Sequence, residues 1–497
     1  MTLIFLLVLP LAASLLCLVI RSRAWLERLN LIAFSGVMAL AFKIGMDVSR
    51  DRVISAMNGL LRADALSAFV VCLVAFVAVA CSIYAVGYFR RDERAGTISG
   101  AQLRRYYGLT PLFVFTMLLV PLVDSLGVMW VATEGTTLAS VLLVTFYNRK
   151  TSFEAGWKYI IIGSVGISLA LFGTIITYYS AVVVLGQETH HGMNWSELVG
   201  VAHRFDKSSM RLAFVFVLVG YGTKAGLVPM HTWKPDAYEQ APVPTAALLG
   251  AGFINCAVYG IARFNVLAVK CLGPEFPGKL LVGFGVASIL VAAPFILAQR
   301  NFRRTLAYSS IDHAGIMVAA LGFGGKLGAL GAVLHMLFHG VTKPLMFFCA
   351  GNVQQHFGTS YFWKVRGVIQ ILPWTGGLFL MATLAVTGTP PFGLFQSEFK
   401  ILSAALAAGD PWAAFLFIAG VVAVFAGFLV HMAKMNLGSK PFVTVEMAPA
   451  ASLETGFRWQ YGAMALVTIF AISLSFWLPG PFYNLLEQAA GIIGGTQ

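Results

Sequence analysis

His335, His339 and Lys343 follow one another at intervals of four residues in the stretch HMLFHGVTK. At about 100° per residue, this spacing keeps all three side chains on one face of an α-helix. That face is a polar stripe on an otherwise apolar helix. Imidazole and amine groups take up and release protons, so the stripe predicts a proton path within an apolar part of the protein.

Further ionisable residues lie inside apolar runs or next to a break in one. They are Glu134 in MWVATEGTTLAS, Lys224 in GYGTKAGLVP, Asp312 and His313 in YSSIDHAGIM, and Glu398 and Lys400 in GTPPFGLFQSEFKIL. An ionised side chain at the centre of a bilayer costs at least about 2.5–3.5 kcal/mol. Each of these residues therefore needs a partner, water or a function.

Some of these residues also have a structural explanation that needs no chemistry. A lysine near a helix end can extend to the lipid headgroups, and a polar group can be satisfied by a neighbouring helix. That explanation and the functional one are equally compatible with Asp312, Lys400, Lys43 and Lys234. A function is favoured where apolar residues flank both sides, as at Glu134, Lys224 and Lys343.

Lysines and carboxylates can act as pairs in such an environment. Burial penalises the charged form of lysine, and a nearby carboxylate offsets that penalty, so moving the carboxylate switches the lysine. The composition supplies two such pairs, Glu134 with Lys224 and Lys343 with Glu398. His335 and His339 are suited to pass protons between them. The residues predict a proton path across the protein, without an energy source in this chain.

The composition identifies the environment of these residues. Hydrophobic residues make up 58% of the 497 residues, charged residues only 11%, and the mean hydropathy is +0.81. Soluble domains carry about a quarter charged residues, so we expect an all-α integral membrane protein. About fourteen apolar runs have the length of a membrane span. They lie near residues 3–20, 29–46, 63–89, 107–123, 125–147, 158–184, 212–230, 241–262, 280–297, 305–321, 329–350, 371–406, 412–435 and 463–478.

Two of these runs are interrupted, at Gly226–Pro229 and at Gly388–Pro391. Broken helices at membrane depth line watery cavities or are buried in protein, and breaks at corresponding places in two halves are typical of transporter repeats. Just beyond the first break, His231 and Asp236 either line the mouth of an opening or cap the second part of the broken helix. We divide the chain into three N-terminal spans, two half-channel repeats and a C-terminal segment, with boundaries at 1–106, 107–262, 263–435 and 436–497.

The charge distribution predicts an orientation. The net charge is +13, and the basic residues concentrate in the connections between apolar runs. Connections after odd-numbered runs hold about twenty basic residues and the others about ten, which predicts that both termini face away from the cytoplasm. Topology in a bacterial or archaeal cytoplasmic membrane thus explains the positive charge, and no nucleic-acid partner is expected.

No motif for a cofactor or a catalytic centre is found in the sequence. The six cysteines are scattered, without a C-x-x-C pair or a cluster suited to zinc or iron–sulfur. His190 and His191 lie in a polar loop without a third ligand. A nucleophile triad and a phosphate-binding loop are also missing. We therefore expect no metal and no cofactor in this chain.

Several stretches together resemble one family. The stretch KAGLVPMHTWKPDAYEQAPVPTAALL is similar to the signature of the antiporter-like, proton-translocating subunits of respiratory complex I, Mrp-type antiporters and membrane-bound NiFe hydrogenases. RADALSAF, MWVATEGTTLAS, RTLAYSSIDHAGIM, HMLFHGVTKPLMFF and GTPPFGLFQSEFKIL agree with it. The likeness extends from about Arg62 to Met435. Within the family, the chain most resembles the hydrogenase-4 component F type.

The resemblance implies a fold and a set of roles. The fold has fourteen transmembrane helices and two inverted five-helix repeats, each with a broken helix. Lys224 would be the central proton carrier, and Glu134 the carboxylate that modulates it. His335 and His339 would link the two halves. Lys343 would be the lysine of the second half, and Glu398 the terminal site on the broken twelfth helix.

The sequence departs from the family's pattern at two positions. Lys234 replaces the apolar residue of HTWLPDA, which would alter the loop above the first half-channel. Asn255 stands where some relatives carry a lysine in the eighth span. A chain of water from Lys224 to His335 would then have to link the two half-channels.

The resemblance favours one function and leaves others open. The leading prediction is a proton-translocating subunit of a redox complex similar to membrane-bound hydrogenase, formate hydrogenlyase or NADH:quinone oxidoreductase. Its partners would be other antiporter-like membrane subunits, peripheral redox subunits with NiFe and iron–sulfur clusters, lipid, and protons or Na+. The alternatives are an Mrp-type Na+/H+ antiporter subunit, the partner of a soluble CO2-hydrating protein, and a structural scaffold that has lost transport.

Overall fold

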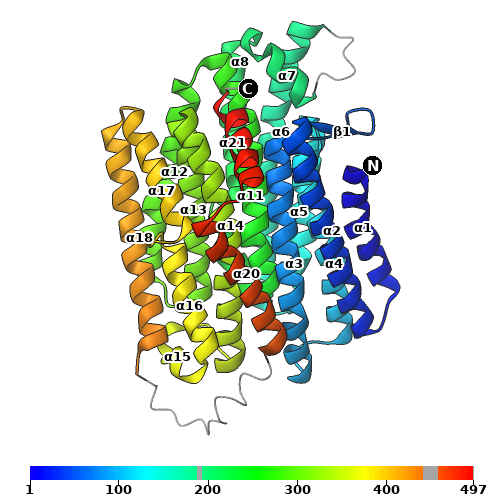
Figure 1. Ribbon diagram of the computed structural model, residues 1–497, viewed down its shortest axis with the longest axis vertical. Coiled ribbons are helices and arrows are strands. Elements are labelled where there is room, and N and C mark those ends of the chain that lie inside the picture. Colours follow the sequence, from blue (N-terminus) through cyan, green and yellow to red (C-terminus); the bar gives the residue numbers. More distant parts are fainter. Residues whose placement is uncertain (187–192, 440–456, 496–497) are drawn as a thin grey trace.

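The described part of the chain is almost entirely helical, and most helices run along the long axis of the molecule (Figure 1). The computed structural model describes residues 1–186, 193–439 and 457–495. Within these residues, 12 helices are long and apolar enough to cross a membrane. The predicted class, an all-α multi-pass membrane protein, is confirmed.

The uninterrupted spans follow the predicted apolar runs. They are α1 (Thr2–Val19), α2 (Arg23–Asp51), α3 (Ala65–Arg94), α4 (Gly100–Leu122), α5 (Leu126–Val144), α6 (Lys150–Leu185), α12 (Glu275–Ala298), α13 (Phe302–Phe323), α14 (Gly325–Phe357), α18 (Pro411–Leu437) and α20 (Arg458–Phe476). One further span is continuous but composite, and consists of α10 (Val243–Ala247), the π-helical η2 (Leu248–Phe253) and α11 (Ile254–Leu272).

Several helices are longer than the predicted runs. Hydropathy reports only the part of a helix that lies in hydrocarbon, whereas the hydrogen-bond ladder continues through capped polar ends. α4, for example, begins at Gly100 because Ser99 and Gln102 form a capping box there. The predicted start at residue 107 was therefore one to two turns late.

Two spans are broken where the sequence predicts it. The first consists of α8 (Lys207–Ala225) and α9 (Trp233–Gln240), and the second of α16 (Pro373–Val386) and α17 (Gly393–Ala407). α8 ends because Gly226 adopts a left-handed conformation with φ 78°, after which Pro229 prevents the helix from resuming. These two broken helices come in addition to the 12 candidate spans and lie where the sequence predicts the interrupted runs.

Some short elements were not predicted from the sequence. They are the hairpin of β1 (Ile54–Ala56) and β2 (Leu61–Ala63), α7 (Trp195–Val201), η1 (Ala202–Arg204), η3 (Phe362–Lys364), α15 (Val368–Ile371) and α21 (Gly480–Gly494). α21 follows α20 and packs against α3 and α14. Polar residues such as Glu487 keep its hydropathy low, so a search for apolar runs does not find it.

The spans form an inner layer and an outer layer. In α14 and in the composite α10–α11 span, every residue of the apolar window is buried, and α13 and α3 are nearly as enclosed. Less than half of the corresponding window is buried in α1, α2, α6, α12, α18 and α20. Both chain ends lie at the same end of the bundle (Figure 1). The polar residues of the predicted path thus sit mainly on the enclosed helices.

The predicted domain boundaries fall partly within helices. The boundary after residue 106 lies inside α4, and the boundary after residue 262 lies inside α11. Connections between helices at 95–99 and 273–274 are better places to divide the chain. The division into two repeats itself stays a prediction.

A buried ion pair fastens α11 to the start of α3. The Nη2 atom of Arg263 donates to Asp64 Oδ1 at 2.6 Å and to Ser67 Oγ at 3.0 Å. The guanidinium lies over the ring of Trp195, 4.2 Å from its centroid. Asp64 also caps α3 by accepting the Ser67 N–H. Removal of either charge would leave the other one buried.

Arg263→Met is therefore expected to lower the free energy of unfolding by about 3–5 kcal/mol, because it removes the close partner of the buried Asp64 carboxylate, which then has only Arg62 at 3.8 Å. Thermal unfolding of the detergent-solubilised protein measures the change. Lys270→Met, a substitution at the exposed end of the same helix, is the matched control. Equal melting temperatures for both variants would contradict the prediction.

Candidate functional site

Glu134 and Lys224 form an ion pair within the bundle. The Nζ atom of Lys224 donates to Glu134 Oε2 at 3.0 Å, and the lysine side chain is fully buried while that of Glu134 is 20% exposed. Lys224 also donates to Thr137 Oγ1, and Ser164 donates to the other carboxylate oxygen of Glu134 at 2.9 Å. The structure thus brings together the first predicted pair, from α5 and α8, with α6 completing the site.

Close packing of α6 and α8 positions Lys224. A Cβ atom on Gly220 would lie 2.6 Å from the backbone nitrogen of Ala170 and 2.7 Å from the carbonyl oxygen of Gly166. Only glycine permits this approach, as at small-residue contacts between transmembrane helices. Lys224 lies one helical turn further along α8 and therefore faces the surface shared by α5 and α6.

Lys343 has a different partner from the one predicted. Its Nζ atom donates to Ser309 Oγ on α13 at 2.9 Å, and the side chain is fully buried. Asp312 lies one helical turn after Ser309 on α13, and it forms no ion pair with Lys343 among the residues that the structure describes. The predicted Lys343–Glu398 pair is wrong, since no such ion pair occurs in the described part of the chain.

The histidines form a connected group between α13, α14 and α17. His313 Nδ1 and His335 Nε2 are 3.0 Å apart, and His335 Nδ1 is 2.9 Å from Ser397 Oγ. The ring of His339 lies against that of His313, tilted by 42°, with the ring centroids 4.7 Å apart. The predicted face of His335, His339 and Lys343 is fully buried along α14. His313, a secondary candidate, joins it from α13.

Glu398 lies at the far end of this group. A carboxylate oxygen of Glu398 and ring nitrogens of His313 and His335 lie within 4.8 Å of one another. Glu398 also packs against Gly388 in the break between α16 and α17. The broken helix therefore places a half-buried carboxylate beside two imidazoles. Lys400, two residues on, is half-buried and points away from this group by the helical geometry.

The same three residues have the composition of a metal site, but their hydrogen bonds favour proton transfer. Both ring nitrogens of His335 are already within hydrogen-bond distance of His313 and Ser397. A metal ligand would have to give up one of these contacts. The expectation of no metal stays a prediction. His190 and His191 lie outside the described residues.

Asp236 fastens the broken helix to both halves of the bundle. Its carboxylate pairs with Arg304 on α13 at 2.5 Å and with Lys158 on α6 at 3.0 Å. It does not cap α9, for which Thr232 is the N-cap residue without a side-chain bond. His231 is buried in the break, and its ring lies 6.3 Å from that of Phe295 and 6.4 Å from that of Tyr308. Neither residue provides a side-chain cap for α9, although Asp236 lies in its first turn, and the interpretation of both as the mouth of an opening stays a prediction.

Asn255 is fully buried at the start of α11. Its Nδ2 atom donates to the carbonyl oxygen of Ala251 in the same span at 2.5 Å. An amide of this kind does not titrate, so Asn255 cannot take over a lysine's role. The eighth span thus has no titratable lysine at position 255, as the sequence predicts.

These clusters form a row of buried titratable groups across the middle of the bundle. The row begins on α5 and α8 and ends on α17, with α9 in contact with both α6 and α13 between them. Figure 1 shows α5 and α17 towards opposite sides of the molecule. The arrangement can hold and pass protons laterally over most of the width of the protein.

A family of known membrane proteins matches this chain. The family model described as "NADH:quinone oxidoreductase/Mrp antiporter, TM" covers residues 123–425, which hold every residue of the row. The chain belongs to this family. The prediction made from its motifs is confirmed.

Individual members of the NADH:quinone oxidoreductase/Mrp antiporter family agree over most of the chain. The hydrogenase-4 component F homolog of Methylacidiphilum infernorum is 35% identical, covering 84% of this chain and 86% of its own. NADH-quinone oxidoreductase subunit N of Desulforudis audaxviator is 29% identical, covering 84% and 81%. A chain of the membrane-bound sulfane sulfur reductase, an archaeal respiratory membrane complex, has the same fold with a TM-score of 0.85, 22% identity, and coverage of 99% and 97%.

Sequence reasoning missed the hydroxyl groups that surround the charges. Thr137 and Ser309 contact the two lysines, and Ser164 and Ser397 contact Glu134 and His335. A signal for two of them existed in the sequence, because Thr137 follows Glu134 and Ser309 precedes Asp312 by three residues, which places each pair on one helix face. The other two depend on packing between helices.

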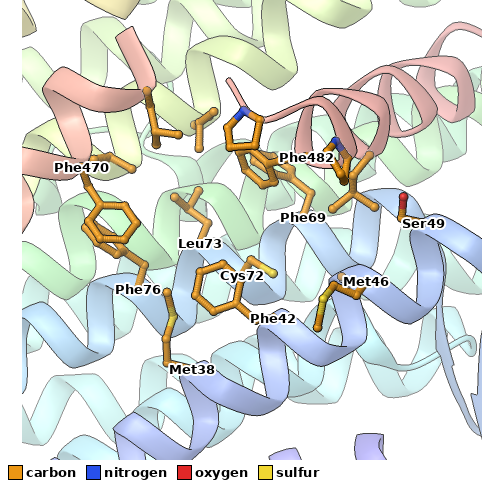
Figure 2. Close-up of a pocket in the computed structure, with 17 residues that line it drawn as sticks. Met38, Phe42, Met46, Ser49, Phe69, Cys72, Leu73, Phe76, Phe470 and Phe482 are labelled. Atoms are coloured by element: carbon orange, nitrogen blue, oxygen red, sulfur yellow. The ribbon is translucent and has the colours of Figure 1, made fainter. Parts of the chain in front are cut away.

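An apolar pocket of about 380 Å³ lies outside this row, between α2, α3 and the segment that joins α20 to α21 (Figure 2). Met38, Phe42, Phe76 and Phe470 point into it, and Ser49 is at its edge. No carboxylate, lysine or histidine is among the residues that line it. The pocket therefore has no part in the row of titratable groups.

Proposed function

We propose that this member of the NADH:quinone oxidoreductase/Mrp antiporter family is the proton-translocating membrane subunit of a redox complex. The observation that carries the proposal is the row of buried titratable side chains from Glu134 to Glu398. Buried ionisable groups are costly in a membrane and mark ion pathways. The names of the relatives, a hydrogenase-4 component and a NADH-quinone oxidoreductase subunit, support a redox complex.

The residues of the row divide into roles. Lys224 is the proton carrier of the first half, and Glu134 controls it through the ion pair. Lys343 is the carrier of the second half, with Asp312 as its carboxylate. His313, His335 and His339 pass protons on to Glu398, from which the broken span of α16 and α17 leads out.

The energy for transport comes from partner subunits in this proposal. Moving one proton against 100 mV takes about 2.3 kcal/mol, and a two-electron reaction releases about 1.4 kcal/mol per 30 mV. A redox drop of about 50 mV per proton is enough. The partners are further antiporter-like subunits and peripheral subunits with NiFe and iron–sulfur clusters. Both termini lie on the non-cytoplasmic side, as the basic connections indicate.

The proposal is tested by purifying the tagged full-length chain in mild detergent with its partners. Mass spectrometry identifies the partners, elemental analysis measures nickel and iron, and a pH-sensitive dye follows proton uptake into proteoliposomes driven by the electron donor. Redox-driven proton uptake that is independent of sodium supports the proposal. Uptake that requires a sodium gradient and no electron donor would instead support the antiporter alternative. This alternative is considered because the family description includes Mrp antiporters. A lone soluble CO2-hydrating partner would contradict the redox proposal.

Glu134→Gln is expected to slow proton translocation about tenfold, the effect of about 1.4 kcal/mol on a rate. Glutamine has the shape of glutamate and can still accept from Ser164, but it leaves the Lys224 ammonium without a negative partner. The dye assay in proteoliposomes measures the rate. Glu154→Gln is the control, because Glu154 is 63% exposed on α6 and pairs only with a lysine in its own helix. A rate for Glu134→Gln equal to that of the control would contradict the role.

A further inference from the structure

Lys234 lies between the two halves of the row. None of the roles proposed above explains why a lysine is buried at this position. Its side chain is fully buried in α9. Its Nζ atom donates to the carbonyl oxygen of Ala225 at 2.5 Å and lies 3.5 Å from the carbonyl oxygen of Ser310. The expected position in a loop above the first half-channel is therefore wrong.

The two contacts connect Lys234 to both lysines of the row. Ala225 directly follows Lys224 at the end of α8, and Ser310 directly follows Ser309, to which Lys343 donates. The amine of Lys234 thus lies at the junction between the first and the second half.

The surroundings of Lys234 do not demand a permanent charge. No carboxylate forms an ion pair with it among the residues that the structure describes, and both hydrogen-bond acceptors are backbone carbonyls. A carbonyl can accept from the N–H of an ammonium and, more weakly, from that of a neutral amine. The negative end of the α8 dipole favours the protonated form when a proton arrives. Lys234 can therefore stay in place in both protonation states.

The break between α8 and α9 creates this position. The left-handed Gly226 leaves room for the lysine stem, since a Cβ atom there would lie 2.7 Å from Lys234 Cδ. Trp233 Nε1 donates to the carbonyl oxygen of Thr223 at 3.0 Å and holds the start of α9 against the end of α8. The two halves of the broken span thus fix the amine next to the end of α8.

The remaining polar group at this depth of the neighbouring span does not fill the gap. Asn255 bonds back to its own helix and carries no titratable proton. From Lys224 towards His339, Lys234 is the titratable side chain that contacts both α8 and α13.

We infer that Lys234 is the proton carrier that links the two half-channels, in place of a lysine in the eighth span. The inference rests on the proposed function. A proton passes from the Lys224 ammonium to the Lys234 amine, which leaves Lys224 as a neutral amine. The Lys234 ammonium then gives its proton to the Lys343 amine or to His339. Each step moves one proton and one positive charge, and no electrons are exchanged.

The alternative is that Lys234 only caps the end of α8. The two roles differ in what arginine can replace. Arginine would keep a positive charge and donors for the carbonyls but does not release its proton in proteins, whereas leucine removes both functions. Leucine is also the residue of the family's HTWLPDA pattern, so the position is expected to accept it.

The test uses the complete complex in proteoliposomes and compares wild type, Lys234→Leu, Lys234→Arg and the control Lys150→Leu at the exposed start of α6. Proton translocation per assembled complex and thermal unfolding are measured together. We expect both Lys234 variants to translocate protons about 100-fold more slowly than wild type, the effect of removing a group that transfers protons. The control is expected to behave as wild type.

Two results would overturn the inference. Wild-type translocation in Lys234→Arg would show that charge alone suffices, and wild-type translocation per assembled complex in Lys234→Leu, with only a lower melting temperature, would show a structural role. Failure of the proposed function is distinct, because wild type itself would then not translocate protons when the electron donor is added. Should Lys234→Arg not assemble, Lys234→Leu still decides.

Discussion

Lys224→Met is expected to lower redox-driven proton translocation about 100-fold while the complex still assembles. Without the lysine, only the partly exposed Glu134 carboxylate can bind a proton at this site, and a charge carried beyond it meets a barrier of at least about 2.5–3.5 kcal/mol. Each 1.36 kcal/mol of barrier slows a rate tenfold. Methionine fills a volume similar to that of the lysine stem, so the contact between α6 and α8 is kept. The dye assay in proteoliposomes measures the loss.

Two controls belong to this experiment. Lys279→Met replaces a lysine that is 77% exposed and pairs with Glu275 in its own helix, and it is expected to leave translocation unchanged. Lys224→Met combined with Glu134→Gln removes both charges, so it separates the loss of the carrier from the cost of an unpaired carboxylate. If Lys224→Met translocated protons at the same rate as Lys279→Met, the role of Lys224 as a proton carrier would be contradicted.

Lys343→Met is expected to lower translocation about 100-fold, as Lys224→Met does. Protons that reach the second half then find no amine near Ser309 and Asp312 to which they can bind. The Glu134–Lys224 pair lies on other helices and is expected to stay intact. Proton uptake and electron transfer measured in the same proteoliposomes show whether the redox reaction continues without transport.

The control for this substitution lies on the same helix. Lys326 is exposed at the start of α14, and Lys326→Met is expected to have no effect on either rate. Asp312→Asn adds a second check, because it removes the carboxylate one helical turn after Ser309, to which Lys343 donates. If Asp312→Asn were silent and Glu398→Gln reproduced the loss at Lys343, the pairing expected from the sequence would be the functional one after all.

Much of the architecture followed from local properties of the chain. The spans were predictable because each needs about 20 apolar residues, and both breaks were predictable because Gly and Pro act on their own backbone. The face shared by His335, His339 and Lys343 follows from helical spacing alone. Helix ends were less predictable, since polar residues extend α4 and α6 beyond their apolar parts, in α4 with a capping box at its start.

Contacts between helices were only partly predictable. Glu134 and Lys224 are 90 residues apart, and their pairing was expected because each is the charged residue at the centre of its span. The same reasoning failed for Lys343, which had two carboxylates to choose from, Asp312 and Glu398. Their distance from the lysine depends on the rotation of α13 and α17 about their axes, which hydropathy does not specify.

The sequence by itself determined the membrane environment, the number of spans, the two breaks and the residue types that can carry protons. These properties depend on composition and on interactions between residues close in the chain. Only the tertiary structure decided that Lys343 bonds to Ser309, that Asp236 joins α6 to α13, and that Lys234 is buried at the junction of the two halves. The reason is that a side chain's partner in a helical bundle depends on how neighbouring helices rotate and approach one another. Small residues such as Gly220 and Gly226 permit a close approach, but their presence in the sequence does not identify which residues they approach.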